Sequence, residues 1–379
     1  MFKVFKYRLY PTRKQVVSMT SQLEGHRFLY NQALAQRKEI YEQTAKGIGY
    51  IFQATNLLPK IRKGNQNLSL CNYSSLQQTL RRLNKSFKTF FRRIKAGEKA
   101  GYPRFKPSDR FNTINYATLN DGCQIKENRL YLQNVGYIKV KWHRPIDGNI
   151  KTLSITRRNN KWYVSFIVEY DINPLPKTGK EIGIDVGLNV FITTSNGQQV
   201  KSPKYLKQSE RKLAKSQKLL SRRKKGSARR KKARILVAKH HEKISNQRLD
   251  FCHQVTNSLV KNYDGFAVEN LNIKNMVKNK YLSKSIHDAG WGMFLNILKC
   301  KAESAGRWYQ EISPNRTSQK CSFCGKVVKK SLAVRMHNCP YCGLSLDRDV
   351  NAALNILQKA RIEPSWRGGV VMPLVEARS

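Results

Sequence analysis

Two cysteine pairs near the C-terminal end of the sequence constrain the fold more than any other feature. They are Cys321-x2-Cys324 and Cys339-x2-Cys342, separated by fourteen residues and each followed by glycine. Two such tight turns can present four thiolates tetrahedrally to one Zn²⁺. With all four positions filled by protein, the predicted site is structural and closed. The alternative, four reduced cysteines in a hairpin, would leave a short polar insertion with nothing to hold it folded.

The chain also has carboxylates inside or beside apolar stretches. Asp185 lies within GIDVG, Glu269 ends FAVE, and Asp347 and Asp349 open the apolar helix of DRDVNAALNI. A buried carboxylate is normally paired or bound to a metal, because burying it unpaired is costly. Taken singly, each could be an ordinary strand-end or helix-capping residue, which suits Asp347 in particular. Together, three converging carboxylates could hold two Mg²⁺ or Mn²⁺ ions for phosphodiester cleavage.

The net charge of the chain indicates the class of its partner. Lys and Arg number 72 against 24 Asp and Glu, which gives a formal net charge of +48. Repulsion of that size requires a polyanion to neutralise it, and nucleic acid is the one we expect. An acidic membrane surface is the alternative. It usually requires only one amphipathic helix or short basic cluster, whereas here basic residues run along the whole chain.

No targeting or membrane segment is visible in the sequence. No apolar run approaches the ~18 residues of a membrane helix, and the N-terminus lacks the apolar core of a signal peptide. We therefore expect a cytoplasmic protein. In such a protein, cysteines outside the two pairs are predicted to be core residues and not disulfides. These are Cys71, Cys123, Cys252 and Cys300.

Two stretches combine an apolar helical face with many basic residues. In 74–97, leucine and phenylalanine recur at three- and four-residue spacings, which predicts an amphipathic helix with its basic face on phosphate. In 201–248, leucines at heptad spacing and two RRKK runs predict a basic helical hairpin. For the first stretch, the alternative is a core helix whose basic face is solvated. For the second stretch, the alternative is a tract like a nuclear-localisation signal or a disordered tail. The candidate nucleic-acid-binding residues are Gln78, Arg81, Arg82, Lys85, Arg92, Arg93, Arg222, Arg223, Arg229, Arg230 and Arg316.

Strand patterns occur in two groups. Residues 2–10 alternate basic and apolar positions, and further strand patterns run through 111–170, with a hairpin turn at Asn159-Asn160 because asparagine tolerates positive φ. The second group begins with EIGIDVGLNVFITTSNGQQV, which predicts two strands and a turn at 195–197. These groups predict an α+β multidomain protein in which the N-terminal strand and 111–170 form a small β-barrel around an inserted helical segment.

Several of these motifs together resemble one protein family. The chain resembles TnpB, a family encoded by many bacterial and archaeal insertion sequences and related to the type V CRISPR effectors. The resemblance covers nearly the whole chain and rests on the N-terminal strand, LRRLNKSFKTFFRRIKAGEKAGYPRFK, GIDVGLNVF, HHEKISNQRLDF, FAVENLNIKNM, TSQKCSFCG, NCPYCG and LDRDVNAALNIL. It implies an RNA-guided DNA endonuclease with a transposon-derived guide RNA. Such a protein reads a short motif beside the DNA target and cuts both DNA strands with one active site.

The resemblance also implies roles for individual residues. Asp185, Glu269 and Asp349 would be the carboxylates of a RuvC nuclease domain of RNase H-like fold, binding catalytic Mg²⁺ or Mn²⁺. Asp349 is preferred to Asp347 because it opens the D-x-N-A-A unit. The four paired cysteines would hold the Zn²⁺ of an inserted ribbon, and Gln78 would lie near the adjacent DNA motif. The protein would act as a monomer with its RNA.

The implied domains follow the order of the motifs. They are a wedge-like barrel (1–11 and 101–175), a helical recognition lobe (12–100), the RuvC domain (176–362, with the basic hairpin 201–248 and zinc ribbon 317–345), and a poorly ordered tail (363–379). Two other functions stay open: a guided DNA binder or repressor without cleavage, and a transposase, because RNase H-like folds also perform strand transfer. Relatives that only bind lose the carboxylates, which this chain retains.

Overall fold

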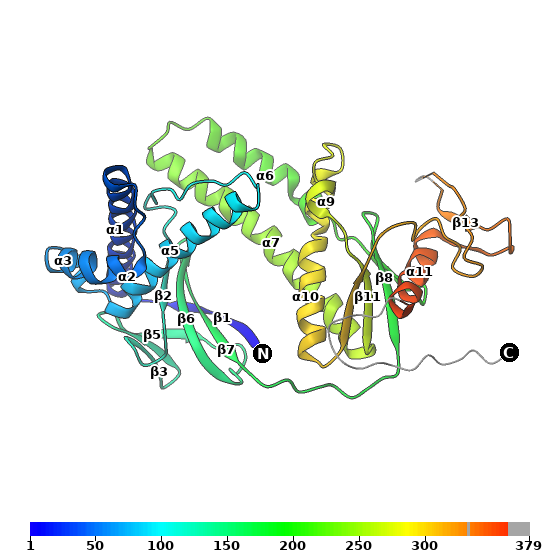
Figure 1. Cartoon of the computed structure of the whole chain (residues 1–379), viewed down its shortest axis with the longest axis horizontal. Coiled ribbons are helices and arrows are strands. Elements are labelled where there is room, and N and C mark those ends of the chain that lie inside the picture. The colour runs from blue at the N-terminus through cyan, green and yellow to red at the C-terminus, as the bar shows by residue number, and fades with distance from the viewer. Residues whose placement is uncertain (332–333, 363–379) are drawn as a thin grey trace. The chain divides into compact units, whose positions relative to one another are not determined.

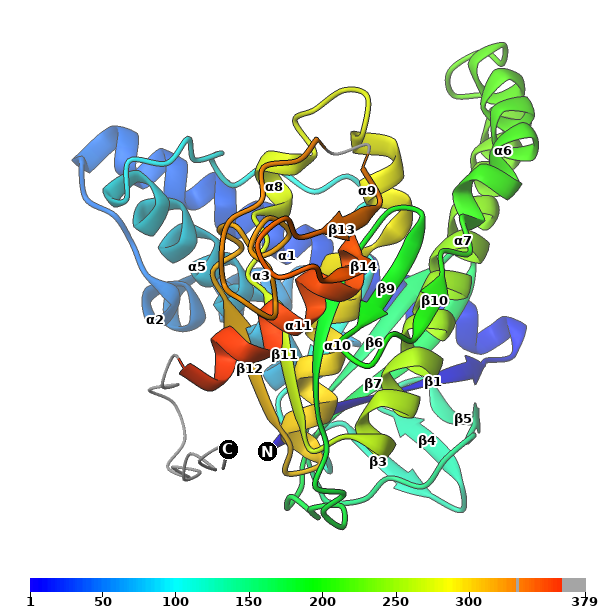
Figure 2. The same cartoon turned by 90° about the vertical axis from the view of Figure 1, so that its right-hand side faces the viewer.

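The computed structural model describes residues 1–331 and 334–362 (Figures 1 and 2). The described residues form two compact units, the first over residues 1–171 and the second beginning at residue 172. The predicted tail, 363–379, lies outside the described residues. Among the described helices, none is both long enough and apolar enough to cross a membrane.

The first unit is built on a seven-stranded antiparallel sheet with the order β2-β6-β7-β1-β5-β4-β3. The N-terminal strand β1 is central, because it pairs with β7 on one side and β5 on the other. Since β2 and β3 stand at opposite ends of the strand order, the predicted barrel is only a half-barrel. The strands are β1 (Phe2–Tyr10), β2 (Thr113–Tyr116), β3 (Cys123–Lys126), β4 (Arg129–Leu132), β5 (Gly136–Lys141), β6 (Asn149–Arg158) and β7 (Lys161–Glu169).

Local sequence explains the central hairpin and strand of this sheet. Phe5, Tyr7 and Leu9 of β1 are buried, as the alternating pattern predicted. The β6–β7 turn uses Asn159 and Asn160 at φ 50° and 59°, so the predicted asparagine hairpin is confirmed.

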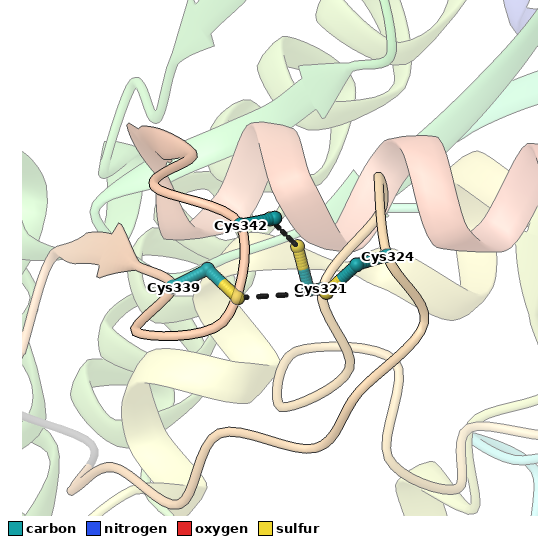
Figure 3. Close-up of side chains that lie close together, drawn as sticks. All are labelled: Cys321, Cys324, Cys339 and Cys342. Atoms are coloured by element: carbon teal, nitrogen blue, oxygen red, sulfur yellow. Dashed lines mark hydrogen bonds between the residues drawn. The ribbon is translucent and has the colours of Figure 1, made fainter.

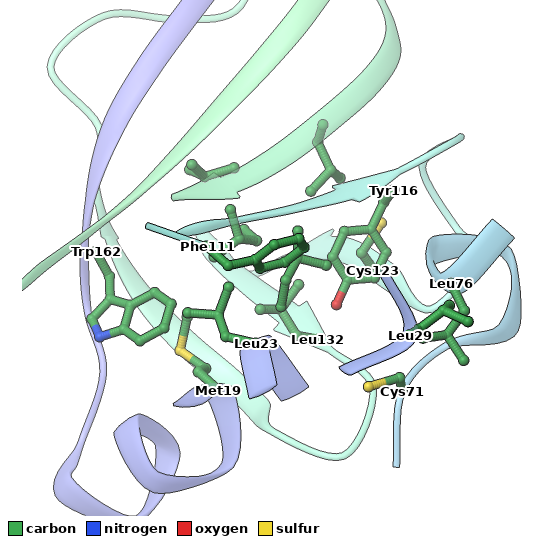
Figure 4. Packing of buried hydrophobic residues seen from close by; sticks show 14 of the residues in the cluster. Met19, Leu23, Leu29, Cys71, Leu76, Phe111, Tyr116, Cys123, Leu132 and Trp162 are labelled. Carbon is green, nitrogen blue, oxygen red and sulfur yellow. The ribbon is translucent and has the colours of Figure 1, made fainter. Parts of the chain in front are cut away.

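Helices of the inserted segment share one hydrophobic core with the sheet. Helix α1 (Arg13–Thr44) begins at a capping box formed by Thr12 and Gln15. Helix α5 (Tyr73–Lys95) corresponds to the predicted amphipathic helix. Figure 4 shows side chains of both helices packed among those of the sheet. Four short elements lie between these helices: α2 (Tyr50–Phe52), the π-helix η1 (Gln53–Leu57), α3 (Leu58–Lys63) and α4 (Gln66–Ser69).

The second unit contains a mixed five-stranded sheet with the order β10-β9-β8-β11-β12. Strands β8, β9 and β10 are antiparallel, whereas β8, β11 and β12 are parallel. The predicted turn at 195–197 is confirmed between β9 and β10, but the stretch before it forms two strands and not one, because the strand is interrupted between β8 and β9 at Gly187. A Cβ there would lie 2.6 Å from the Val190 carbonyl oxygen. The strands are β8 (Glu181–Val186), β9 (Val190–Thr194), β10 (Gln199–Lys201), β11 (Gly265–Glu269) and β12 (Trp308–Ile312).

Helices cover both faces of this sheet. Phe266 and Val268 of β11 share a core with α7 and α10, whereas Ala267, which points the other way, packs with Ile356 and Ala360 of α11. The predicted basic hairpin is confirmed as α6 and α7. The helices are α6 (Tyr205–Ser221), α7 (Ala228–Asn262), α8 (Ile273–Met276), α9 (Ser283–Ala289), α10 (Trp291–Ser304) and α11 (Arg348–Ile362). The small strands β13 (Met336–Asn338) and β14 (Ser345–Asp347) belong to the cysteine-containing ribbon.

The cysteines outside the two pairs only partly follow the prediction. Cys71, Cys123 and Cys252 are buried core residues. Cys300 is exposed, because it lies on the solvent side of α10, so its predicted burial was wrong.

Candidate active site and metal centre

Three predicted carboxylates border one cleft of the second unit. Asp185 lies near the end of β8 and Glu269 at the end of β11. These two strands are parallel neighbours, so both carboxylates come to the same edge of the sheet. Asp349 lies in the first turn of α11. All three, together with Asp347, line a cleft of about 1100 Å³.

Backbone contact fixes how close α11 lies to β8. Gly183 faces the helix, and a Cβ built on it would come within 2.1 Å of the Ala353 carbonyl oxygen and 3.0 Å of Leu357. No side chain fits there, so the helix rests directly on the strand two residues before Asp185. This close approach sets the position of Asp349 relative to Asp185.

Asp347 serves as the cap of α11. Its Oδ1 accepts hydrogen bonds from the backbone N–H groups of Asp349 at 2.9 Å and Val350 at 3.1 Å. The ordinary capping interpretation of Asp347 therefore fits the structure, and its neighbour Asp349 keeps its carboxylate for other partners.

Two carboxylates of the cleft have raised pKa values. Burial raises the pKa of Asp185 well above its usual value, and the nearby carboxylates of Glu269 and Asp349 raise it further, while Arg348 opposes the rise. Burial also raises the pKa of Glu269, against the opposing effects of Thr317 and Lys359. Bound cations would relieve this repulsion, so the donor set fits hard divalent ions.

Two arginines lie near Asp349. Arg335 Nη1 is 3.8 Å from Asp349 Oδ2, and Arg348 Nε is 3.6 Å from Asp349 Oδ1. Among the described residues, only the four thiols of the ribbon form a group of three or more potential metal ligands within 4.8 Å of one another. The carboxylates of the cleft are therefore more widely spaced than these thiols. Carboxylates that share two ions need not touch, because such ions lie about 3.5–4 Å apart.

The four paired cysteines converge as predicted (Figure 3). Their Sγ atoms all lie within 4.8 Å of one another. Cys321 and Cys342 approach to 3.7 Å, and Cys324 and Cys339 to 3.6 Å. Four thiols gathered in this way fit a tetrahedral Zn²⁺ site. His337 lies outside the set, and its Nδ1 contacts Lys330.

The two cysteine turns have the same backbone geometry. Gly325 N donates to the Cys321 carbonyl and Gly343 N to the Cys339 carbonyl, both at 3.0 Å. Both glycines have positive φ, 74° and 73°, which explains why glycine follows each pair. Burial opposes ionisation of the Cys339 thiol, yet backbone N–H groups and neighbouring thiols hold its pKa at about 7. The turn thus favours the thiolate form of Cys339, which a metal needs. At Cys342 the backbone N–H of Leu344 acts in the same direction, but burial and the neighbouring thiols raise the pKa to about 12.

Two asparagines of α11 attach the ribbon to the helix that carries Asp349. Asn351 accepts from Ser322 N at 2.9 Å and donates to the Lys320 carbonyl at 2.8 Å. Asn355 donates to the carbonyls of Lys320 at 2.7 Å and Thr317 at 2.8 Å. The first cysteine turn and the start of α11 are therefore one hydrogen-bonded assembly.

Thr317 extends this assembly to Glu269, because its hydroxyl donates to Glu269 Oε1. The sequence interpretation missed Thr317, Asn351 and Asn355. The signal for the asparagines was two amides spaced i, i+4 within the apolar stretch VNAALNIL of α11, which is unusual unless both amides are satisfied inside the protein. No sequence signal marked Thr317.

The predicted nucleic-acid-binding residues differ in exposure. Arg81, Lys85, Arg92, Arg222, Arg229 and Arg316 are exposed, whereas Gln78, Arg82, Arg93, Arg223 and Arg230 are half-buried.

Several of the half-buried arginines have partners within their own unit. Arg82 lies 5.3 Å from the Phe111 ring, and Arg93 pairs with Glu98 at 2.8 Å. Arg230 Nη1 donates to the carbonyls of Leu220 and Arg223, both at 2.9 Å, and so closes the α6–α7 turn.

Three family models match the chain. Residues 165–280 match a model described as a probable transposase, residues 291–356 one described as a Cas12f1-like TNB domain, and residues 1–46 one described as a helix-turn-helix domain. In this structure, residues 1–46 contain β1 and the single long helix α1, with no second helix.

Two relatives span most of the chain. A Streptomyces pristinaespiralis protein named as an RNA-guided DNA endonuclease is 34% identical over 94% of this chain and 88% of that protein. InsQ of Escherichia coli (strain K12), named in the same way, is 29% identical over 94% of this chain and 91% of its own length.

Similar solved structures include two Cas12 effectors. A Cas12f1–sgRNA–target DNA complex aligns over 94% of this chain and 99% of that chain, at 17% identity and a TM-score of 0.37. The mini-RNA-guided endonuclease CRISPR-Cas_phi3 aligns over 94% of this chain and 92% of that chain, at 11% identity and a TM-score of 0.46.

Proposed function

The chain belongs to the TnpB family of RNA-guided DNA endonucleases, and from this premise we propose how it cleaves DNA. A guide RNA selects the target by base pairing, and the second unit hydrolyses the phosphodiester bonds. The observation that carries this proposal is that Asp185, Glu269 and Asp349 border one cleft. An intact set of three acids favours a nuclease over a binder that has lost cleavage.

Asp185, Glu269 and Asp349 would hold catalytic Mg²⁺ or Mn²⁺. When bound, such ions activate a water and stabilise the leaving oxygen of a phosphodiester. The carboxylates come from two parallel strands and a helix that packs against one of them, so their relative positions depend on the fold and not on a mobile loop. Burial is the main cause of the raised pKa values of Asp185 and Glu269, and for Asp185 the neighbouring carboxylates of Glu269 and Asp349 add to it.

The four cysteines would bind Zn²⁺ in a structural role. No fifth protein group joins the thiol set among the described residues. Through Asn351 and Asn355, a zinc-bound ribbon would support the start of α11 and thereby Asp349. Thr317 would orient Glu269 by its hydroxyl hydrogen bond.

We assign 1–11 with 101–175 to a wedge-like domain, 12–100 to a recognition lobe, and 176–362 to a RuvC domain. The mixed five-stranded sheet with helices on both faces supports an RNase H-like fold for the last of these. The excess of basic residues supports binding of a guide–target duplex through its backbone.

The test is cleavage of a plasmid that carries a guide-matched target, by the wild-type protein with its RNA and by Asp185→Ala. We expect Mg²⁺-dependent cutting by the wild type and a loss of at least about a thousandfold in the variant. Asp347→Asn, which keeps a side-chain oxygen to cap α11, is the matched control and should retain most activity. Equal cutting by wild type and Asp185→Ala would contradict the site assignment.

A further inference from the structure

The loop between β8 and β9 lies beside the first of the three carboxylates. It spans residues 187–189, so only Val186 separates it from Asp185. All of its residues line the carboxylate cleft. The loop is closed by the Gly187 N–H, which donates to the Phe191 carbonyl at 3.2 Å. A shift of this loop would therefore move the end of β8 that carries Asp185.

Helix α10 contacts the chain on both sides of this loop. Trp291, the first residue of α10, donates from its indole Nε1 to the Gly187 carbonyl at 3.2 Å. Phe294 packs edge-on against Phe191, with the ring centroids 5.1 Å apart. Because Trp291 and Phe294 are three positions apart, they lie on the same face of the helix. That face therefore holds the chain where the loop begins and just after it ends.

Two glycines stand two residues before and after Asp185, and a different helix contacts each of them. Helix α11 rests on Gly183 from one face of the sheet. Helix α10 belongs to the core on the other face, and it reaches the Gly187 carbonyl through Trp291. The end of β8 is therefore supported from both faces, by direct packing at Gly183 and by a hydrogen bond at Gly187.

The indole of Trp291 is itself held firmly. Trp291 is 4% exposed and packs in the core that α10 shares with the sheet. A buried indole N–H normally finds an acceptor, so the simplest interpretation is that the Gly187 carbonyl only satisfies it. That acceptor, however, belongs to a loop that lines the cleft. The ring is fixed by the core, so its N–H gives the loop a fixed point of attachment.

We propose that Trp291 is a positioning residue for Asp185. By holding the Gly187 carbonyl, it fixes the loop that follows β8 and thereby the place of the Asp185 carboxylate in the cleft. A divalent ion shared by three carboxylates requires each of them in a defined position, and groups that orient metal ligands contribute to metal affinity. The choice of a metal ion as the ligand of Asp185 rests on the proposed function.

The test is binding of Mn²⁺ to the full chain with its copurifying RNA, measured by the paramagnetic resonance of free Mn²⁺. RNA also binds Mn²⁺, so the binding that Asp185→Ala abolishes defines the ion at the cleft. Trp291→Phe, which keeps an aromatic ring and loses the N–H, should weaken this binding about three- to tenfold. Benzothienylalanine at position 291, which keeps the two-ring shape and has sulfur in place of the N–H, should have the same effect.

Leu298→Val is the matched control. Leu298 is fully buried on the same helix, about two turns beyond Trp291, so its truncation loosens the core without removing the hydrogen bond to the loop. This variant should lower the melting temperature and leave Mn²⁺ binding unchanged. Hydrogen exchange of the loop is a second measurement, which needs no metal. The Gly187 N–H should exchange faster in Trp291→Phe than in Leu298→Val.

Equal Mn²⁺ affinity or equal loop exchange in Trp291→Phe and Leu298→Val would overturn the proposal, because Trp291 would then be a core residue only. The proposed function has a separate outcome. If Asp185→Ala keeps the Mn²⁺ and cuts the target as the wild type does, the proposed metal site is wrong and the role of Trp291 fails with it. If Asp185→Ala loses the Mn²⁺ and Trp291→Phe does not, only the role of Trp291 is wrong.

Discussion

At the scale of single residues, buried polar side chains join segments that are far apart in the chain. His26 of α1 is fully buried, with Nδ1 2.8 Å from Thr79 Oγ1 and Nε2 3.2 Å from Ser75 Oγ on α5. Burial lowers the pKa of His26 to about 3, and the positive charge of Arg82 contributes in the same direction. The imidazole therefore stays neutral in the folded protein at physiological pH.

This histidine predicts an acid sensitivity of the first unit. An unfolded histidine titrates near pH 6.5, whereas folded His26 does not take up a proton until about pH 3. Between these values the unfolded state binds more protons, so stability falls as the pH falls. From pH 7 to pH 5 the free energy of unfolding should decrease by about 2 kcal/mol through this residue. Denaturant unfolding of the wild type and His26→Gln at both pH values measures it, and an equal pH dependence of the two would contradict it.

At the scale of elements, α11 connects the zinc ribbon to the carboxylate cleft. Its first turn carries Asp349, its apolar side packs on the sheet, and its two asparagines hold the segment before the first cysteine turn. Asn351 and Asn355 are 0% and 6% exposed. Their side-chain amides donate to the Thr317 and Lys320 carbonyls and so supply the hydrogen bonds that water would supply at an exposed site.

Removal of one of these amides should loosen the ribbon. Asn355→Ala removes the side-chain donor of the Thr317 carbonyl and one of the two that the Lys320 carbonyl accepts, at a cost of about 1–3 kcal/mol. We expect faster zinc release to a colorimetric chelator and slower cleavage. Gln358→Ala is the matched control, because exposed Gln358 donates at 2.9 Å to the Ser322 carbonyl of the same turn. Equal rates of zinc release from both variants would show that the buried Asn355 amide does not stabilise the zinc ribbon more than the exposed Gln358 amide does.

The sequence predicted those elements whose signal is local. The α5 helix, the Asn159–Asn160 hairpin and the α6–α7 hairpin each follow from periodicity or turn chemistry within a short window. The four cysteines were predictable because their spacing alone specifies a metal site. By contrast, Thr317 and Glu269 are 48 residues apart in the sequence, and no local sequence pattern around either residue predicts the hydrogen bond between them. The gap between β8 and β9 was missed because it arises from a close backbone approach at Gly187.

At the scale of the whole molecule, the net charge of +48 dominates its behaviour toward nucleic acids. Each phosphate that a lysine or arginine neutralises releases counterions, so the affinity falls steeply with added salt. The basic side chains are not equivalent in this respect, because some are committed to contacts within the protein. Arg222 and Arg229 are exposed near the α6–α7 turn, whereas Arg230 closes the turn itself.

The salt dependence should separate these roles. If Arg222 and Arg229 each contact a phosphate, the double variant Arg222→Gln/Arg229→Gln should reduce the slope of log affinity against log salt by about 2. Arg230→Gln should instead lower the melting temperature, because the guanidinium hydrogen bonds to the Leu220 and Arg223 carbonyls are lost. Filter binding from low to moderate salt and thermal unfolding measure the two effects. An unchanged slope in the double variant would remove these arginines from the nucleic-acid interface.

The close packing of α11 on Gly183 limits which mutations of the gene leave the protein active. Every single-base change of a glycine codon that alters the residue adds a side chain or ends the chain, and here a side chain would meet the Ala353 carbonyl oxygen. The helix would then be pushed off the strand, and the acids it helps to align would separate. A copy of this gene can therefore lose its activity while all three acids remain in the reading frame. A survey that counts only the genes with all three acids intact will therefore overestimate how many of the encoded proteins still cleave DNA.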